Sequence, residues 1–207
     1  MFTFFYAPNT CSLASHIALE EAQAPYEARR VDFTAAEQRT PAYLAVNPKG
    51  RVPALVTPRG VLTETPAILA FIAQSFPEAR LAPLDDPFLF AEVQAFNSYL
   101  CSTVHVAHAH RVRGSRWADD ADAHIAMQKK VPENMTACFE LIEKEMPRGP
   151  WAMGKDYSIA DPYLFTIAGW LGSDGVDIAR FPRVHDHFNR MLERPAVRRA
   201  RDAAAAA

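Results

Sequence analysis

The sequence is poor in the features that mark several classes of protein. Its three cysteines, Cys11, Cys101 and Cys138, lie too far apart to suggest a disulfide framework, which suits a reducing cytoplasm. No apolar run approaches the length that spans a membrane, and the N-terminus has no signal-peptide pattern. The net charge is only −2, so no overall basic field indicates nucleic acid. We therefore expect a cytoplasmic protein without a nucleic-acid or membrane partner.

Chain length and proline placement predict two domains. The 207 residues, 49% hydrophobic and 22% charged, are ordinary for a globular protein. Residues 76–87 contain prolines that oppose a continuing helix or strand. Strand and helix patterns precede this linker, whereas only helical periodicity follows it. The predicted domains are residues 1–77 and residues 88–207.

The first domain alternates short apolar runs with amphipathic segments. This order favours a small mixed sheet flanked by helices. The predicted strands are Phe2–Tyr6, Tyr26–Asp32, Val52–Thr57 and Val61–Thr63, of which the last two form a hairpin, and the predicted helices are Cys11–Ala22, Glu37–Ala45 and Thr65–Ser75.

The second domain shows helices alone. The segment Ser158–Asp161 has the form of a capping box, and the apolar run Tyr163–Trp170 behind it predicts a helix buried on nearly all sides. Pro132 is expected to kink or interrupt a long helix. The other predicted helices are Phe88–Arg111, Asp119–Met146, Val184–Glu193 and Pro195–Asp202.

Cys11 is the first candidate for chemistry. It follows a buried strand and a turn at Pro8-Asn9, and it begins a predicted helix. Unpaired N–H groups and the helix dipole at that position favour a thiolate, which predicts a pKa below that of a free thiol. The alternative interpretation is that Cys11 is a small packing residue.

Four segments, in order, resemble those of one family. They are Pro8–Ile17 with its cysteine, Tyr43–Leu55 leading to Val52-Pro53, Leu62–Ile68 with an acid and a hydroxyl, and the capping box Ser158–Asp161. Over its whole length the chain resembles the cytosolic glutathione transferases, most closely the bacterial beta class.

The resemblance implies a fold, a co-substrate and a reaction. The fold would be an α/β thioredoxin-like domain (βαβ-α-ββα, with a mixed four-stranded sheet) followed by an all-α helical bundle. The enzyme would conjugate the glutathione thiolate to small hydrophobic electrophiles bound in the helical domain, a detoxifying activity. It would form a homodimer. A non-catalytic binding or interaction module on the same fold is the alternative.

The resemblance also assigns glutathione-binding residues. Glu64 would hold the amino group of glutathione, although a first-turn acid also stabilises its own helix. Thr65 at a helix start suits a carboxylate, and the backbone of Val52 would pair with the tripeptide beside a cis Pro53. Arg51 belongs to the same segment. In the helical domain, Ser98, with Asn97 beside it, aligns nearest the family's asparagine.

Cys11, Ser12 and His105 are the predicted catalytic residues. Cys11 or Ser12 would donate a hydrogen bond to the glutathione thiolate, and His105 would face the thiol. Alternatively, Cys11 would form a mixed disulfide and support disulfide-reductase or peroxidase activity, with one thiol only because no second cysteine follows it closely. Sequence reasoning leaves the choice between Cys11 and Ser12 open.

Other positions depart from the family or invite a different interpretation. The lysine that often follows the Val-Asp pair is missing after Asp32, and Gln38 or Arg39 are the candidates to replace it. His105, His108 and His110 lack thiols or carboxylates at suitable spacing, so no metal is expected. His16, one turn after Cys11, is expected at a surface or interface.

Aromatic or apolar side chains of the helical domain would form the substrate wall and core, namely Phe96, Tyr99, Val104, Trp117 and Trp170.

Overall fold

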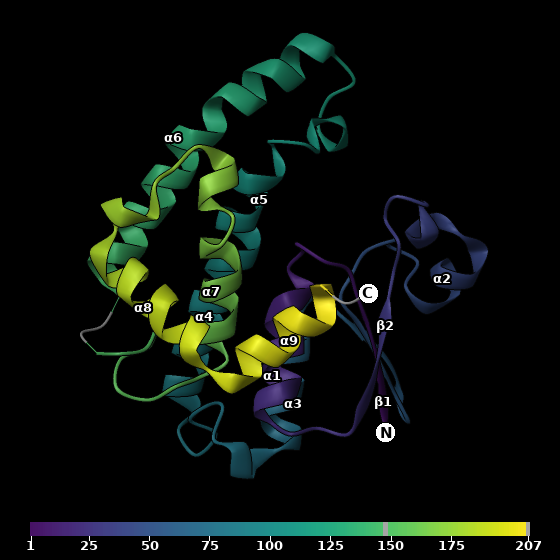
Figure 1. The fold of residues 1–207 in the computed structure, drawn as a ribbon, viewed down its shortest axis with the longest axis vertical. Coiled ribbons are helices and arrows are strands. Elements are labelled where there is room, and N and C mark those ends of the chain that lie inside the picture. Colours follow the sequence, from purple (N-terminus) through teal and green to yellow (C-terminus); the bar gives the residue numbers. More distant parts are fainter. Residues whose placement is uncertain (147–148, 206–207) are drawn as a thin grey trace.

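The computed structural model describes residues 1–146 and 149–205. A four-stranded sheet with its helices lies beside a taller bundle of helices (Figure 1). This arrangement confirms the predicted α/β domain followed by an all-α domain. Residues 147–148 and 206–207, which the second predicted domain includes, lie outside the described residues.

The sheet is mixed, as predicted. Its strand order is β2-β1-β3-β4, in which β1 pairs with β2 in parallel and the remaining neighbours are antiparallel. In chain order the elements are β1 (Phe2–Tyr6), α1 (Ser12–Glu21), β2 (Tyr26–Arg30), α2 (Pro41–Val46), β3 (Ala54–Thr57), β4 (Gly60–Thr63) and α3 (Thr65–Ser75).

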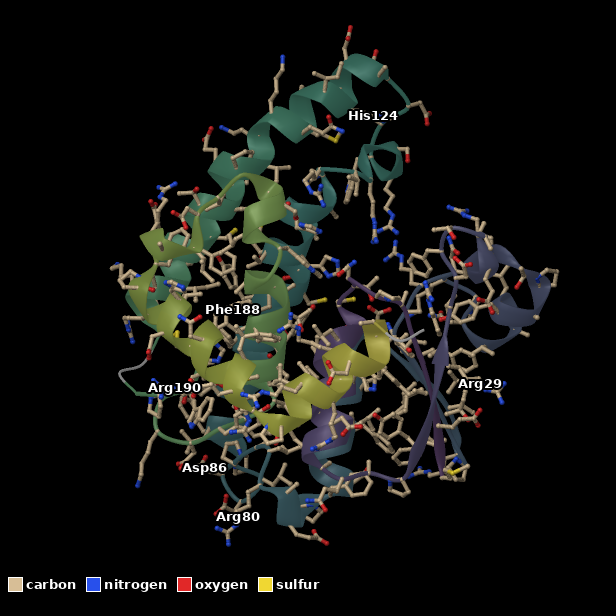
Figure 2. All side chains as sticks on the ribbon, in the orientation of Figure 1. Arg29, Arg80, Asp86, His124, Phe188 and Arg190 are labelled. Carbon is tan, nitrogen blue, oxygen red and sulfur yellow. The ribbon has the colours of Figure 1, made fainter. Side chains whose placement is uncertain are left out.

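Both faces of β1 are covered, because successive side chains of a strand point to opposite faces. Phe4 is fully buried in the core that α1 and α3 share with the helical domain. Phe5 points to the other face and packs against Tyr43 of α2, with ring centroids 5.6 Å apart. Figure 2 shows the exposed Arg29 and Arg80 at the periphery, outside these layers.

Three predicted elements in this domain differ from the structure by more than one residue, and the bounds of α1 and β4 differ by one residue. Strand β2 ends at Arg30 rather than Asp32. The predicted helix Glu37–Ala45 is a short 3₁₀ turn followed by α2, which starts afresh because Thr40 is extended and its hydroxyl accepts from Tyr43 N at 3.3 Å. Strand β3 begins only after Pro53, since proline has no N–H to give to the sheet.

The helical domain contains a further difference from prediction. The expected single helix Phe88–Arg111 is divided by a π-helical turn at Leu100–Val104 and ends at Ala109. A π turn holds one extra residue, which changes the faces on which the following side chains lie. The helices are α4 (Pro87–Tyr99), α5 (His105–Ala109), α6 (Ala121–Glu145), α7 (Ala160–Ala168), α8 (Pro182–Glu193) and α9 (Pro195–Ala205).

Helix α6 runs through Pro132 without a break, so the expected interruption is wrong. A proline removes one backbone hydrogen bond from a helix interior. Here packing compensates for that loss, because Val131, Met135 and Phe139 bury one side of α6 in the core.

Helix α7 is buried along its whole length, as predicted. The capping box is also confirmed, since Asp161 Oδ2 accepts from Ser158 N at 2.7 Å. The fully buried carboxylate does more than a surface cap, because its Oδ1 accepts from Ala152 N at 2.7 Å and lies 2.9 Å from His187 Nε2 of α8. One carboxylate thus joins the start of α7 to two other segments.

His16 was expected at a surface or interface, and this prediction was wrong. Only 2% of its surface is exposed, and its ring lies among those of Phe4, Tyr6 and Tyr26. Burial lowers the pKa of His16 to about 4. Helix α1 presents this residue to the sheet because its other side packs against the helical domain, which leaves no surface for His16 to face.

Removing the Asp161 carboxylate should destabilise the fold. We expect Asp161→Ala to lower the free energy of unfolding by about 3–5 kcal/mol, because its buried donors lose their acceptor. Urea denaturation followed by circular dichroism measures this change. The control is Asp186→Ala, which removes an exposed acid of α8 and should change stability by less than about 1 kcal/mol. Equal effects of the two substitutions would contradict this role.

The buried His16 should make stability depend on pH. Between pH 6.5 and about 4 the unfolded chain binds a proton at this residue and the folded chain does not, so stability falls as pH decreases through this window. From pH 7.5 to pH 5 the loss due to His16 is about 2 kcal/mol. Urea midpoints of His16→Phe should therefore fall less than those of the wild type over this range. A variant with the full wild-type pH dependence would rule out His16 as its source.

Candidate active site

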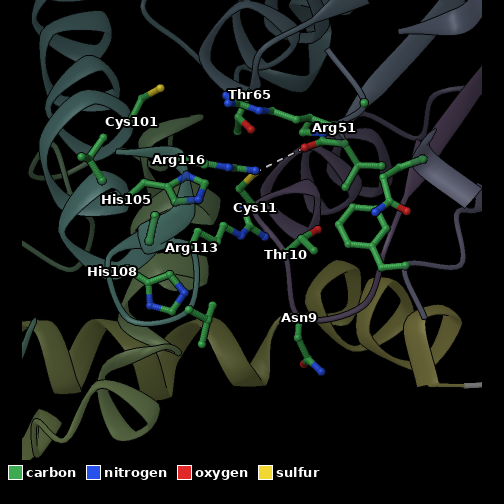
Figure 3. Close-up of a pocket in the computed structure, with 18 of the residues that line it drawn as sticks. Asn9, Thr10, Cys11, Arg51, Thr65, Cys101, His105, His108, Arg113 and Arg116 are labelled. Carbon is green, nitrogen blue, oxygen red and sulfur yellow. Dashed lines mark hydrogen bonds between the residues drawn. The ribbon is translucent and has the colours of Figure 1, made fainter. Parts of the chain in front are cut away.

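A cleft of about 530 Å³ opens between the two domains. The sheet domain contributes the turn before α1, the loop before β3 and the start of α3, and the helical domain contributes α5, the turn after it and residues of α7 (Figure 3). Of the predicted site residues, the cleft brings together Cys11, Arg51, Val52, Pro53, Glu64, Thr65 and His105. Ser12 and Ser98 are not in its lining.

Cys11 occupies the N-cap of α1, and its Sγ lies 3.6 Å from Val52 O, to which the thiol donates (Figure 3). Burial raises the pKa of this thiol, and the smaller effects of the Thr65 hydroxyl and the Arg113 charge only partly oppose it. The prediction of a lowered pKa is therefore wrong.

The reason lies in the first turn of α1. Its N–H groups are used locally, because Leu13 N donates to Thr10 O and Ala14 N donates to Cys11 O, each at 3.2 Å. Ser12 N donates to the Thr10 hydroxyl at 3.3 Å. These three donors do not serve the sulfur, and the backbone N–H of Cys11, which favours the thiolate, has a smaller effect than burial.

Ser12 is the first residue of α1 and is fully buried against the turn that precedes it. Its hydroxyl donates to Ala7 O at 3.1 Å, accepts from Ala7 N at 3.2 Å and lies 2.7 Å from the Thr10 hydroxyl. With these contacts Ser12 holds the turn in shape. Of the two candidates to meet a ligand in the cleft, the geometry favours Cys11.

The loop before β3 presents backbone to the cleft. The Val52–Pro53 peptide bond is cis, as predicted. The carbonyl of Arg51 accepts from Tyr43 Oη at 2.7 Å and from Asn47 Nδ2 at 2.6 Å, which ties the loop to α2. Val52 is thereby held outside the sheet ladder, where its backbone can pair with an extended ligand.

Glu64 and Thr65 lie at the start of α3. Glu64 adopts a positive φ of 71° and makes no side-chain cap to its own helix, so the alternative role as a helix-stabilising acid finds no support. Its carboxylate pairs with Lys49 Nζ, which also donates to the Thr63 hydroxyl at 2.7 Å. Thr65, the first residue of α3, is buried against the cleft.

Four arginines line the cleft, namely Arg39, Arg51, Arg113 and Arg116. Burial, followed by the charges of Arg113, Arg51 and Arg39 in that order, lowers the pKa of Arg116 to about 10. Gln38 and Arg39, the two candidates to replace the missing lysine, are both in the lining. Among the ion pairs of residues 1–146 and 149–205, none includes these four arginines.

His105 and His108 stand on the opposite wall with Trp170, whose indole lies 4.9 Å and 4.3 Å from their ring centroids. Burial, followed by the charges of His108 and the arginines, lowers the pKa of His105 to about 4, so its ring is neutral at pH 7. His108 Nδ1 lies 2.8 Å from the buried carboxylate of Asp174, which also pairs with Arg111 at 3.0 Å.

The apolar side chains expected in the substrate wall and core divide between the two. Trp117 and Trp170 line the cleft, whereas Val104 is in the core, with Phe96 and Tyr99 packed against it.

Ser98 is exposed on α4 and Asn97 is buried within it, so neither reaches the cleft. The ring of His110 lies 4.3 Å from that of Trp117, at a tilt of 45°, rather than joining the other histidines. No cluster of possible metal ligands occurs among the described residues.

Sequence reasoning missed three features of the site. Arg113 and Arg116 follow α5 in a basic run, Arg111–Arg116, that could have been noticed as a cluster of charge. Asp174 gave no local signal, since 66 residues separate it from His108. Cys101 lines the same cleft as Cys11, although only the chain neighbours of Cys11 were considered for a second thiol.

No helix within the described part of the chain is long and apolar enough to cross a membrane.

The chain and its fold are similar to known proteins along their whole length. A glutathione transferase homologue from Sulfitobacter, solved with bound glutathione, is 46% identical with a TM-score of 0.95, and the match covers 98% of each chain. The beta-class glutathione S-transferase of Sphingomonas chungbukensis is 32% identical with a TM-score of 0.85, again over 98% of each chain. The glutathione S-transferase GstA of Escherichia coli O157:H7 is 30% identical over 199 residues, or 95% of each chain.

Family models match both domains. The model "Glutathione S-transferase, N-terminal domain" matches residues 1–74, and the model "Glutathione S-transferase, C-terminal domain" matches residues 115–195. The chain therefore belongs to the glutathione S-transferase family of enzymes.

Proposed function

We propose that this protein binds glutathione in the cleft and transfers its thiolate to an electrophilic carbon. The observation that carries this proposal is the convergence on one cleft of the Val52 backbone, which lies outside the sheet, a helix start at Thr65 and the Cys11 thiol. These three groups suit, respectively, the peptide-like middle, a carboxylate and the sulfur of glutathione.

The ends of glutathione carry charge that the cleft can complement. Glu64 lies beside Thr65 at the start of α3. At one end of glutathione, the amino group would therefore meet the Glu64 carboxylate, and the carboxylate would meet the helix N-terminus at Thr65. Lys49, which holds Glu64 in the free protein, would then share the carboxylate with the ligand amine. Gln38, Arg39 and Arg51 remain for the carboxylate at the other end.

In the reaction the sulfur of glutathione attacks carbon, a C–S bond forms, and the leaving group departs with the electron pair of the broken bond. Because the pKa of Cys11 is raised, this residue is a protonated thiol at neutral pH and can donate to the glutathione thiolate. The contact of the thiol with Val52 O in the free protein supports this role, since the same proton would turn to the glutathione sulfur.

The raised pKa of Cys11 also disfavours the alternative mechanism, in which Cys11 forms a mixed disulfide with glutathione. Disulfide reduction or peroxidase activity needs Cys11 as a thiolate nucleophile, and burial disfavours that form. Four further statements stay predictions that accompany the proposed transferase activity. They are the domain bounds 1–77 and 88–207, the homodimer, the cytoplasmic location and the detoxifying role.

Calorimetric titration with reduced glutathione tests the site. We expect the wild type to bind glutathione. The substitution Glu64→Gln keeps the size of the side chain but removes its charge. This variant should bind about tenfold more weakly, because a charge-assisted hydrogen bond to the amino group is lost. The control is Glu78→Gln, in the exposed linker, with wild-type affinity. Unchanged affinity of Glu64→Gln would remove this residue from the site, and no binding by the wild type would favour a non-catalytic module.

The protonation state of Cys11 can be measured directly. In a Cys101→Ser, Cys138→Ser variant, the rate of alkylation by iodoacetamide should rise with a midpoint above pH 9.0, the ordinary pKa of a thiol, because burial raises that pKa. Adding Cys11→Ala should abolish the reaction. A midpoint near neutral pH would instead support Cys11 as a nucleophile in a mixed-disulfide cycle.

A further inference from the structure

The cleft carries more positive charge than glutathione requires. Glutathione has two carboxylates and one ammonium group, and its amino-terminal end matches Glu64 and Thr65. Glu64 is the only carboxylate among the residues of the described chain that line the cleft, and it already pairs with Lys49. One carboxylate of glutathione therefore remains for four guanidinium groups.

The excess lies on the helical-domain side. Figure 3 shows Arg113 and Arg116 extending toward Cys11 from the side that carries His105 and His108, whereas Arg51 comes from the sheet domain. Arg113 follows α5, and Arg116 ends the 3₁₀ turn Gly114–Arg116. Both side chains thus stand across the cleft from the backbone of Val52, on the wall that faces the attacking sulfur.

The turn that carries these two arginines is anchored. A Cβ at Gly114 would lie 2.9 Å from the ring of His124 on α6, so only glycine lets the turn approach α6 this closely. His124 Nε2 in turn lies 2.5 Å from Ala118 O. The arginines are therefore presented by a packed turn, which reduces the entropy lost when they bind an anion.

Neighbouring groups leave this positive charge uncompensated. His105 is neutral at pH 7. The buried Asp174 is engaged by His108 and Arg111, so it is not directed at Arg113 or Arg116. Mutual repulsion already lowers the pKa of Arg116, and an anion bound between the guanidinium groups would relieve that repulsion.

We propose that the second substrate is an electrophile that carries a carboxylate, which Arg113 and Arg116 bind while Trp117 and Trp170 contact its planar apolar part. The inference rests on the proposed transferase function and replaces its hydrophobic electrophile with an anionic one. Guanidinium groups match carboxylates in shape and charge, and an indole face suits an aromatic or conjugated acid. A purely apolar substrate would leave the half-buried Arg113 and the exposed Arg116 without an anionic partner.

A matched pair of substrates tests this assignment. 4-Chloro-3-nitrobenzoate is anionic, and its methyl ester is neutral with the same reacting carbon. With either compound the glutathione thiolate attacks the carbon that bears chlorine, a C–S bond forms, and chloride leaves with the electron pair of the C–Cl bond. Because the ester group activates the ring toward this attack more strongly than the carboxylate does, each variant is compared with the wild type on the same substrate.

We expect Arg113→Gln, Arg116→Gln to lose at least about tenfold in kcat/KM for the acid relative to the wild type, with less than about threefold loss for the ester. Arg113→Lys, Arg116→Lys should recover part of the loss, since the charge returns without the planar fork. The control Arg59→Gln removes an exposed arginine at the β3–β4 turn and should leave both rates unchanged. Equal losses for acid and ester would mean that the arginines act on glutathione, which overturns the proposal.

A binding measurement separates this inference from the transferase reaction itself. 3-Nitrobenzoate has no leaving group, and its binding is measured by quenching of tryptophan fluorescence with and without glutathione. Binding by the wild type that the double glutamine variant loses would support the anion site even if neither chlorinated compound is turned over, and in that case only the proposed function fails. Absence of arginine-dependent binding would overturn the anion site whether or not the ester is conjugated.

Discussion

The packing of α1 on both of its sides is the constraint on which the rest of the structure depends. One side of this helix lies on the sheet, and the other contacts α7 and α9 of the helical domain. Ion pairs at the end of α1 reinforce this contact, because Arg194 binds Glu21 through two hydrogen bonds of 2.5 Å and 2.9 Å, and Arg199 pairs with Glu20. The start of α1, which carries Cys11, is thereby set opposite His105.

Burial, as much as residue type, decides which side chains in the cleft are charged. The thiol of Cys11 and the ring of His105 are held in their uncharged forms because burial disfavours the charged ones. Asp174 is charge-matched by its own partners on the far side of His108. What remains facing the cavity is a set of guanidinium groups, whose charge persists at neutral pH. The resulting site combines a protonated thiol, backbone donors and a positive field, all of which suit sulfur and carboxylate anions.

Sequence reasoning succeeded where a local pattern has a single physical solution. Alternating apolar residues gave the four strands, and the capping box at Ser158–Asp161 gave the start of α7. The pattern around Val52-Pro53 correctly indicated the cis bond. It failed where a long-range contact outweighed the local pattern. His16 reads as a polar helix residue yet lies among aromatic rings, and the first turn of α1 consumes the N–H groups that were expected to stabilise a Cys11 thiolate.

The sequence by itself determined the two kinds of domain, because strands, helix caps and proline act over a few neighbouring residues. Its resemblance to a known family supplied the family and most of the sheet-domain residues that line the cleft. Only the tertiary structure decided which helical-domain residues join them. Arg113, Arg116 and Cys101 reach the cleft because a π turn, a short α5 and the close contact of Gly114 with His124 set their directions. Such contacts join residues distant in the chain, and whether a buried group is charged depends on all of its neighbours at once.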